Sequence, residues 1–144
     1  MKNVTKQRAR IARVRRLQHN LAAASAAEAA SRLQMLEVNQ ARLAAMRGEL
    51  RAGQGIGDGA ALARIGELAM RLDGARLGLG RSIDQARALA MARESARLTA
   101  RRDQESADKL HQAATSAAAA SADRRLQARV ARPRRVTQME DGEQ

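Results

Sequence analysis

Apolar residues recur at intervals of three and four along the first third of the chain, the spacing that places them on one face of an α-helix. An alanine-rich block at 22–30 separates two runs of larger apolar side chains. The stripe consists of Ile11, Val14, Leu17 and Leu21 before that block, and of Leu36, Leu43, Met46 and Leu50 after it. This pattern predicts one long helix over residues 5–50.

The second half of the chain shows a repeat of seven residues, in which two positions, a and d, form the apolar seam of a coiled coil. Position a is taken by Ile65, Leu72, Leu79 and Ala86, and position d by Leu68, Ala75, Ser82, Leu89 and Ala96. The repeat predicts a second helix over residues 60–131. This helix is expected to end before Pro133, because proline has no amide hydrogen to donate.

Residues 51–59 separate the two predicted helices and carry glycine at every second position from 53 to 59. Glycine at this density breaks a helix, and the carboxylate of Asp58 is well placed to cap the first turn of the next one. Two helices joined by so short a connection bury their seams by folding back on each other. We therefore predict an all-α fold, in which two long helices form an antiparallel coiled-coil hairpin.

This hairpin is expected to form a single elongated domain over residues 1–144, with a glycine-rich loop at 51–59 and a disordered tail at 133–144. A symmetric turn places residue i opposite roughly residue 110 − i, so Arg16 is predicted to lie near Glu94. The second helix then overhangs the first from about residue 107 to residue 131.

The chain contains no aromatic residue and no cysteine. Aromatic side chains dominate globular cores and ligand pockets, so their absence argues against a compact enzyme. His19 and His111 lie far apart in the expected register and cannot share a metal, and the Gly-x-Gly spacing in the loop follows a helix rather than a strand. We expect a non-enzymatic protein that needs neither metal nor cofactor and has no membrane-spanning segment.

The formal net charge is +12, and much of the basic charge lies in two blocks without any acidic residue, one near each end of the chain. The residues predicted to contact a partner are Arg8, Arg10, Arg13, Arg15, Arg16, Arg124, Arg125 and Arg129. Three interpretations remain open for these blocks: a solvated charged face, a contact for an acidic protein, and a contact for nucleic acid or an anionic membrane. Nucleic acid is the less favoured of the partners, since no aromatic side chain can stack on a base.

The layout resembles the flagellar FliJ proteins and their type III secretion relatives, which are small basic coiled-coil hairpins. The resemblance rests on residues 10–21 (RIARVRRLQHNL), on the break near the middle, and on residues 83–110 with their charged segment at 101–109. It implies a stalk-like component of a protein export apparatus that inserts into the hexameric export ATPase and contacts the export gate and substrate chaperones. Such a protein is cytoplasmic and peripheral to the inner-membrane export apparatus, reaching the membrane only through its partners.

This chain departs from the family pattern because it lacks the aromatic residues that members often carry in the part of the rod that contacts the gate. Contact with the gate is therefore the weaker implication of the resemblance. Two alternatives from other classes remain. One is a basic helical protein associated with nucleic acid, whose affinity falls steeply with salt. The other is a generic coiled-coil scaffold that self-associates through residues 107–131.

Overall fold

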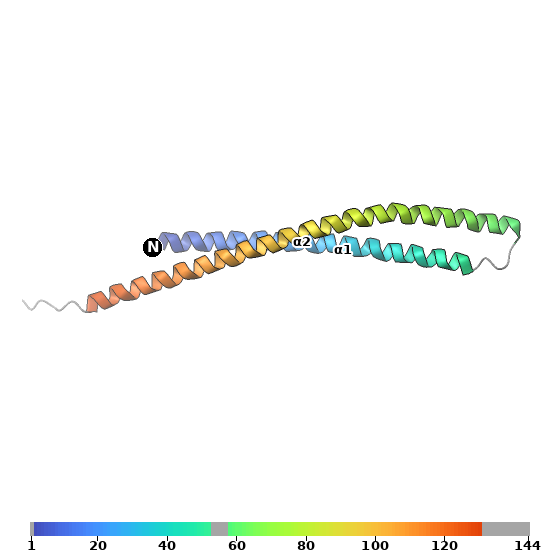
Figure 1. Cartoon of the computed structure of the whole chain (residues 1–144). Coiled ribbons are helices and arrows are strands. Elements are labelled where there is room, and N and C mark those ends of the chain that lie inside the picture. The colour runs from blue at the N-terminus through green and yellow to red at the C-terminus, as the bar shows by residue number, and fades with distance from the viewer. Residues whose placement is uncertain (1, 53–57, 131–144) are drawn as a thin grey trace, which may run out of the picture.

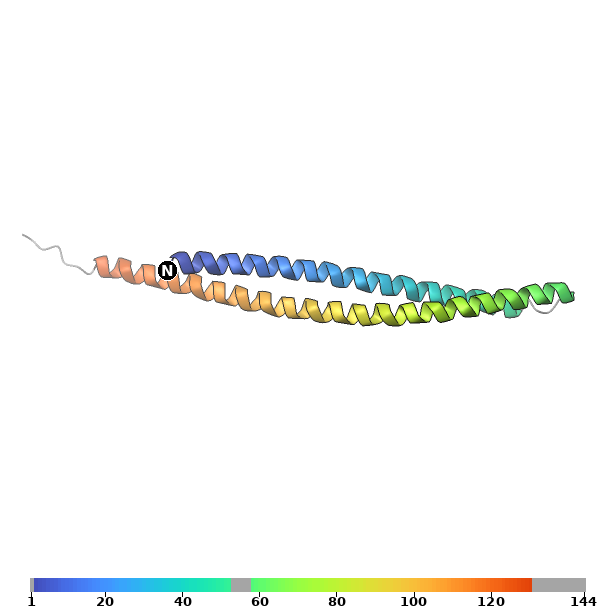
Figure 2. The ribbon, with the colours of Figure 1, turned by 90° about the horizontal axis from the view of Figure 1, so that it is seen from above.

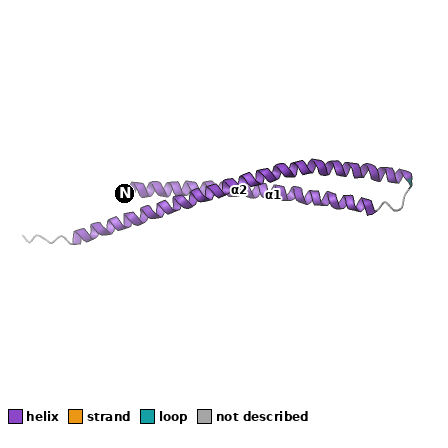
Figure 3. Cartoon of the chain, viewed as in Figure 1, coloured by secondary structure: helices purple, strands orange, loops and turns teal. Residues whose placement is uncertain are grey.

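The computed structural model describes residues 2–52 and 58–130, which form two α-helices, α1 (Lys2–Ala52) and α2 (Gly59–Val130). At 1.5 Å per residue, α1 is about 76 Å long and α2 about 108 Å. The helices run antiparallel and wind around each other along their shared length (Figure 1, Figure 2). Helix accounts for nearly all of the part that the structure describes, and no strand occurs there (Figure 3). The prediction of an all-α hairpin is confirmed.

The start of α2 is fixed by an N-terminal cap. The Oδ1 atom of Asp58 accepts a hydrogen bond from the amide of Ala61 at 2.8 Å, and its carbonyl oxygen accepts one from the amide of Leu62 at 3.1 Å. Relative to the predicted bounds, α1 begins three residues earlier and ends two residues later, and α2 begins one residue earlier. The centre of the predicted loop, at 53–57, and the predicted tail with Pro133 lie outside the described residues.

The seam between the helices follows one heptad pattern on each helix. On α1 the seam residues that lie buried or half-buried include Ala12, His19, Ala22, Ala26, Ala29, Leu33, Leu36, Gln40, Leu43, Arg47 and Leu50. On α2 they are Ile65, Ala69, Leu72, Arg76, Leu79, Ile83, Ala86, Ala90, Arg97, Ala100, Gln104, Ala107, His111 and Ala114. Of the described residues only six alanines and Ile83 are buried, so the seam is thin.

The apolar stripe predicted for the first half of α1 does not lie in the seam. Ile11, Val14, Leu17 and Leu21 are all exposed, and so is Met46. Leu36, Leu43 and Leu50 stand seven residues apart and lie half-buried in the seam. A coiled coil needs one continuous heptad phase, and that phase leads back from Leu36 to Ala29, Ala22 and Ala12 rather than to the larger residues. Alanine at these positions lets the two backbones approach closely.

On α2 the predicted second core position lies one residue too early. Leu68 and Leu89 are exposed, whereas their neighbours Ala69 and Ala90 lie in the seam. A heptad contains spacings of both three and four residues, and large side chains at 68 and 89 favour the shorter spacing on the sequence alone. Packing against α1 instead selects the spacing of four residues, from Ile65 to Ala69.

Four ion pairs between the helices define the register: Arg15–Asp103 (3.2 Å), Arg16–Asp108 (3.4 Å), Arg47–Asp73 (3.3 Å) and Glu37–Arg87 (3.2 Å). The two residue numbers of each pair add up to between 118 and 124. The predicted register was therefore wrong by about three helical turns. The reason is visible in Figure 1, where α2 begins beyond the C-terminal end of α1, so that the hairpin does not turn symmetrically about the loop.

The overhang of α2 is shorter than predicted. Ala107 is buried, Asp108 pairs with α1, and Ala114 is half-buried, so this part of α2 still packs against α1. Residues 122–130 are all exposed and project past the N-terminus of α1 (Figure 2). Arg16 does not meet Glu94, whose partner is Arg97 of the same helix.

Candidate partner-binding surface at the open end of the hairpin

The end of the hairpin opposite the loop carries most of the excess positive charge. We define this open end as residues 2–27 of α1 with residues 101–130 of α2. The first 27 residues of the chain contain seven basic residues and no acidic one. The rest of the hairpin is closer to balanced, since residues 28–52 and 58–100 together contain eleven basic and eight acidic residues. The rod is therefore electrically polarised along its length.

The basic residues predicted to contact a partner differ in how they are engaged. Arg10 and Arg13 are exposed on α1 and have no ion-pair partner among the described residues. The same holds for Arg124, Arg125 and Arg129, which lie on the projecting end of α2. These five guanidinium groups are available to an acidic partner.

The remaining three predicted contact residues take part in the hairpin itself. Arg15 pairs with Asp103 and Arg16 with Asp108, although both arginine side chains stay largely exposed. Arg8 is half-buried and lines a hollow between the helices. The sequence placed all eight residues in one class, because the acidic residues of α2 that meet Arg15 and Arg16 could be identified only from the register.

Apolar side chains lie beside the basic ones on the open end. Val4, Ile11, Val14, Leu17 and Leu21 are exposed on α1. One hollow between the helices is lined by Arg8, Ile11, Arg15, Asp103, Ser106, Ala107 and Leu110. A second hollow, on α1 alone, is lined by Arg10, Ile11, Val14, Arg15 and Gln18. The sequence showed this periodicity, which was assigned to the core instead of the surface.

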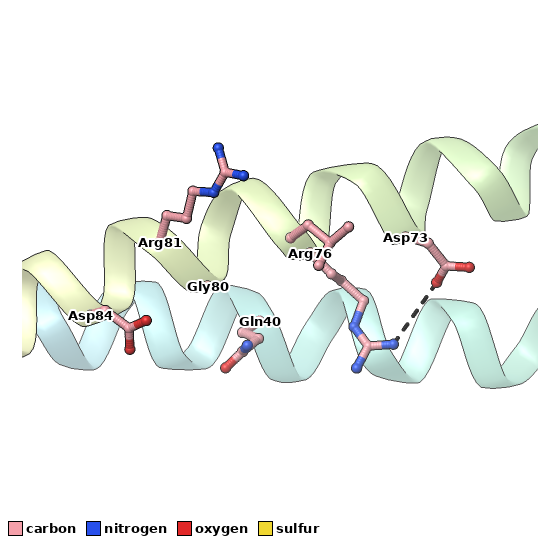
Figure 4. A pocket seen from close by; sticks show the side chains of 7 residues that line it. Gln40, Asp73, Arg76, Gly80, Arg81 and Asp84 are labelled. Carbon is pink, nitrogen blue, oxygen red and sulfur yellow. Dashed lines mark ion pairs between the residues drawn. The ribbon is translucent and has the colours of Figure 1, made fainter.

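A groove between the helices lies nearer the loop (Figure 4). It is lined by Gln40, Asp73, Arg76, Leu77, Gly80, Arg81 and Asp84. Arg76 extends toward α1 and pairs with Asp73 at 4.0 Å, whereas Arg81 points away from α1 (Figure 4). Asp73 also pairs with Arg47 across the seam. Among the charged residues that line this groove, Asp73 is the one that forms an ion pair with α1, and the pairs of Arg76 and Asp84 lie within α2.

Polar groups interrupt the seam in both halves of the hairpin. Within residues 2–52 and 58–130, the Nε2 atom of His19, the Nε atom of Arg76 and the Nδ1 atom of His111 are buried without a hydrogen-bond partner. Given the register of the ion pairs, the two histidines are offset by roughly 13 Å along the axis. No group of three or more potential metal-ligating His, Cys, Asp or Glu side chains occurs within 2–52 and 58–130.

Glu94 and Arg97 of α2 form an ion pair that shifts the pKa of both groups. The guanidinium of Arg97 contacts the carboxylate of Glu94 in a bidentate manner, with Nη2–Oε1 at 2.6 Å and Nε–Oε2 at 2.8 Å. These hydrogen bonds lower the pKa of Glu94 and raise the pKa of Arg97, since they favour the charged form of each group. The pair joins positions three residues apart and supports α2 locally.

Neither described helix contains a stretch long and apolar enough to cross a membrane. Comparison with known proteins gives no further assignment. No protein-family model matches the chain, no curated protein resembles it significantly, and no solved structure does.

Proposed function

We propose that this chain is a non-enzymatic, stalk-like component of a flagellar or type III protein export apparatus, whose open end binds the ring of the export ATPase. The observation that carries the proposal is the gathering, at one end of a long rod, of arginines such as Arg10 and Arg13 that have no ion-pair partner in the described part of the chain. The resemblance of residues 10–21 and 83–110 to the FliJ proteins supplies the identity of the partner.

A rod of this kind suits a protein partner on physical grounds. Arginines on an exposed helix add little to fold stability, yet they attract an acidic surface over the range of the Debye length. Reversal of their charge should therefore weaken association without opening the hairpin. The export gate and substrate chaperones are further proposed partners, and the location is cytoplasmic, at the periphery of the inner-membrane apparatus.

The test compares two matched double variants. Arg10→Glu with Arg13→Glu reverses charge at the open end, where neither side chain has an ion-pair partner among the described residues. Arg42→Glu with Arg93→Glu makes the same change in charge at exposed positions elsewhere on the rod. Arg16 is left intact because it pairs with Asp108.

ATP hydrolysis by the export ATPase is measured against the concentration of each variant, at low and high salt. Only the open-end variant is expected to lose stimulation, and the stimulation by the unmodified protein should weaken as salt rises. A titration with random-sequence DNA runs in parallel. Unchanged ATPase stimulation together with lost DNA binding contradicts the stalk assignment and supports a nucleic-acid-associated protein.

A further inference from the structure

Helix α1 carries two apolar faces, of which α2 covers one. The covered face contains small or polar residues near the open end, such as Ala12 and His19. The second face contains Val14 and Leu21, one heptad apart, and Leu17 between them. These residues occupy heptad positions away from the seam, so the second face points outward from the hairpin.

The outward face exposes larger side chains than the seam buries. Leu21 is 64% exposed, Leu17 60% and Val14 49%, whereas Ala12 of the seam is buried. Single exposed leucines are ordinary on protein surfaces. A row with helical spacing that continues through Ile11 to Val4 is different, because it has the pattern of a helix that packs against a second neighbour.

The charges around this row indicate what kind of neighbour it fits. Lys6, Arg10 and Arg13 stand among or beside its apolar side chains, and no acidic residue occurs in the first 27 positions. A second copy in a parallel arrangement would place two such basic segments against each other. An acidic partner would instead gain both apolar contact and charge complementarity.

We propose that the outward face of α1 from Val4 to Leu21 is a docking site for an amphipathic helix of a partner protein, with acidic residues bordering its apolar stripe. The site spans about 27 Å, which matches a helix of about 18 residues. Its anchors would follow the i, i+3, i+4, i+7 pattern of helix-in-groove recognition. The hollow lined by Arg10, Ile11, Val14, Arg15 and Gln18 receives one of these anchors.

This site goes beyond the proposed function, since it holds for any partner that presents such a helix. The proposed stalk function and the proposed docking site are contradicted by different experiments. Loss of ATPase stimulation on charge reversal concerns the identity of the partner. Binding of a helical peptide to the outward face concerns only the chemistry of the surface.

The probe is a synthetic helical peptide of 21 residues with leucine at a and d positions, glutamate on both borders and one tryptophan beside the leucines. Because the chain has no aromatic residue, tryptophan fluorescence reports the peptide alone. We expect a blue shift on titration with the full chain. A peptide with lysine in place of each glutamate is the matched control and is expected not to bind.

The double substitution Val14→Ser with Leu21→Ser should lower the affinity of the chain for the glutamate peptide about tenfold, equivalent to about 1.4 kcal/mol of binding free energy. Met70→Ser with Met91→Ser is the control variant, since these α2 side chains are 73% and 70% exposed and lie off the proposed site. The circular dichroism of both variants should match that of the unmodified chain.

Equal binding of the lysine peptide, or unchanged binding by the Val14/Leu21 variant, would overturn the proposal. Light scattering and anionic phosphatidylglycerol vesicles test the other occupants. A dimer that the Val14/Leu21 variant dissociates assigns the face to a second copy. Vesicle binding that the same variant abolishes, without any binding of the glutamate peptide, assigns it to a membrane.

Discussion

The two halves of the hairpin differ in the size of the apolar side chains that lie in the seam between the helices. In the half near the loop, Leu36, Leu43 and Ile83 lie in the seam between the helices. In the half near the open end, the seam holds alanine and histidine, and Leu17 and Leu21 are exposed. The free energy gained by burying apolar groups is proportional to the apolar area removed from water. The half near the loop therefore contributes more to holding the hairpin closed. The open half leaves its larger apolar groups exposed.

The largest effect is expected from a pair of substitutions that tests this comparison by introducing a carboxylate into each half. Ile83→Asp places a carboxylate at a position that is 4% exposed, and should lower the free energy of unfolding by about 3 kcal/mol or more. Leu21→Asp makes the same chemical change at an exposed position and should cost no more than about 0.5 kcal/mol. Thermal unfolding followed by circular dichroism compares the two. Equal shifts would show that the halves do not differ as described.

A second change should make the halves more alike. His19→Leu removes a buried ring nitrogen that lacks a hydrogen-bond partner and adds apolar area to the open-half seam. We expect a gain of about 1 kcal/mol, together with slower amide hydrogen exchange around residues 12–26. Asn20→Leu is the control, because Asn20 is exposed beside the seam. A similar slowing in the control would assign the effect to helix propensity alone.

A third change should widen the difference by strengthening the loop half. Gly74 and Gly78 lie on α2 with no positive φ, and a Cβ atom built on either would have no neighbour within 4 Å. Each replacement by alanine should therefore stabilise by about 0.5–1 kcal/mol. The reverse substitution Ala75→Gly, at an exposed position, should destabilise by a similar amount. Chemical denaturation measures both, and a loss on Gly78→Ala would reveal a role for glycine in helix packing.

The smallest expected effect concerns the Glu94–Arg97 pair between the two halves of α2. Its hydrogen bonds hold the folded-state pKa of Glu94 below the ordinary value of 4.5. The pair therefore stabilises the fold above that value, and the contribution is lost as pH falls through the lowered pKa. Titration of the Glu94 carboxyl by NMR should show the midpoint returning toward 4.5 in Arg97→Gln. An unchanged midpoint would mean that Arg97 does not hold the carboxylate in solution.

The sequence was sufficient for features that depend on local chemistry. Spacings of three and four residues indicated the helices, clustered glycines indicated the break, and Asp58 indicated the cap. Heptad phase and register could not be read in the same way. Alanine fits both seam and surface positions of a helix. The alanine-rich block at 22–30 therefore does not reveal how the heptad positions of Leu21 and Leu36 are related. The pairing of Arg16 with Asp108 joins residues 92 positions apart and depends on that register.

The candidate surface was predicted only in part for a related reason. Arg10 and Arg13 were identified from charge alone, and they are exposed as a contact surface requires. The apolar centre beside them was assigned to the core, because a periodic row of large side chains usually faces one. Which side of a helix its neighbour covers is a property of the pair of helices. The sequence of one helix alone therefore does not reveal which of its sides is covered.

The alanine seam also determines how the rod would respond to force. Two helices whose side chains interlock firmly bend together and resist bending strongly. Two helices that can slide past each other bend separately and resist bending less. Small alanine side chains interlock little, so we expect the half near residues 12–29 to bend more easily. We expect the section next to the loop, where Leu36, Leu43 and Ile83 lie in the seam, to be stiffer. A load applied at the basic tip would be absorbed as curvature near that tip, before it reached the rest of the molecule.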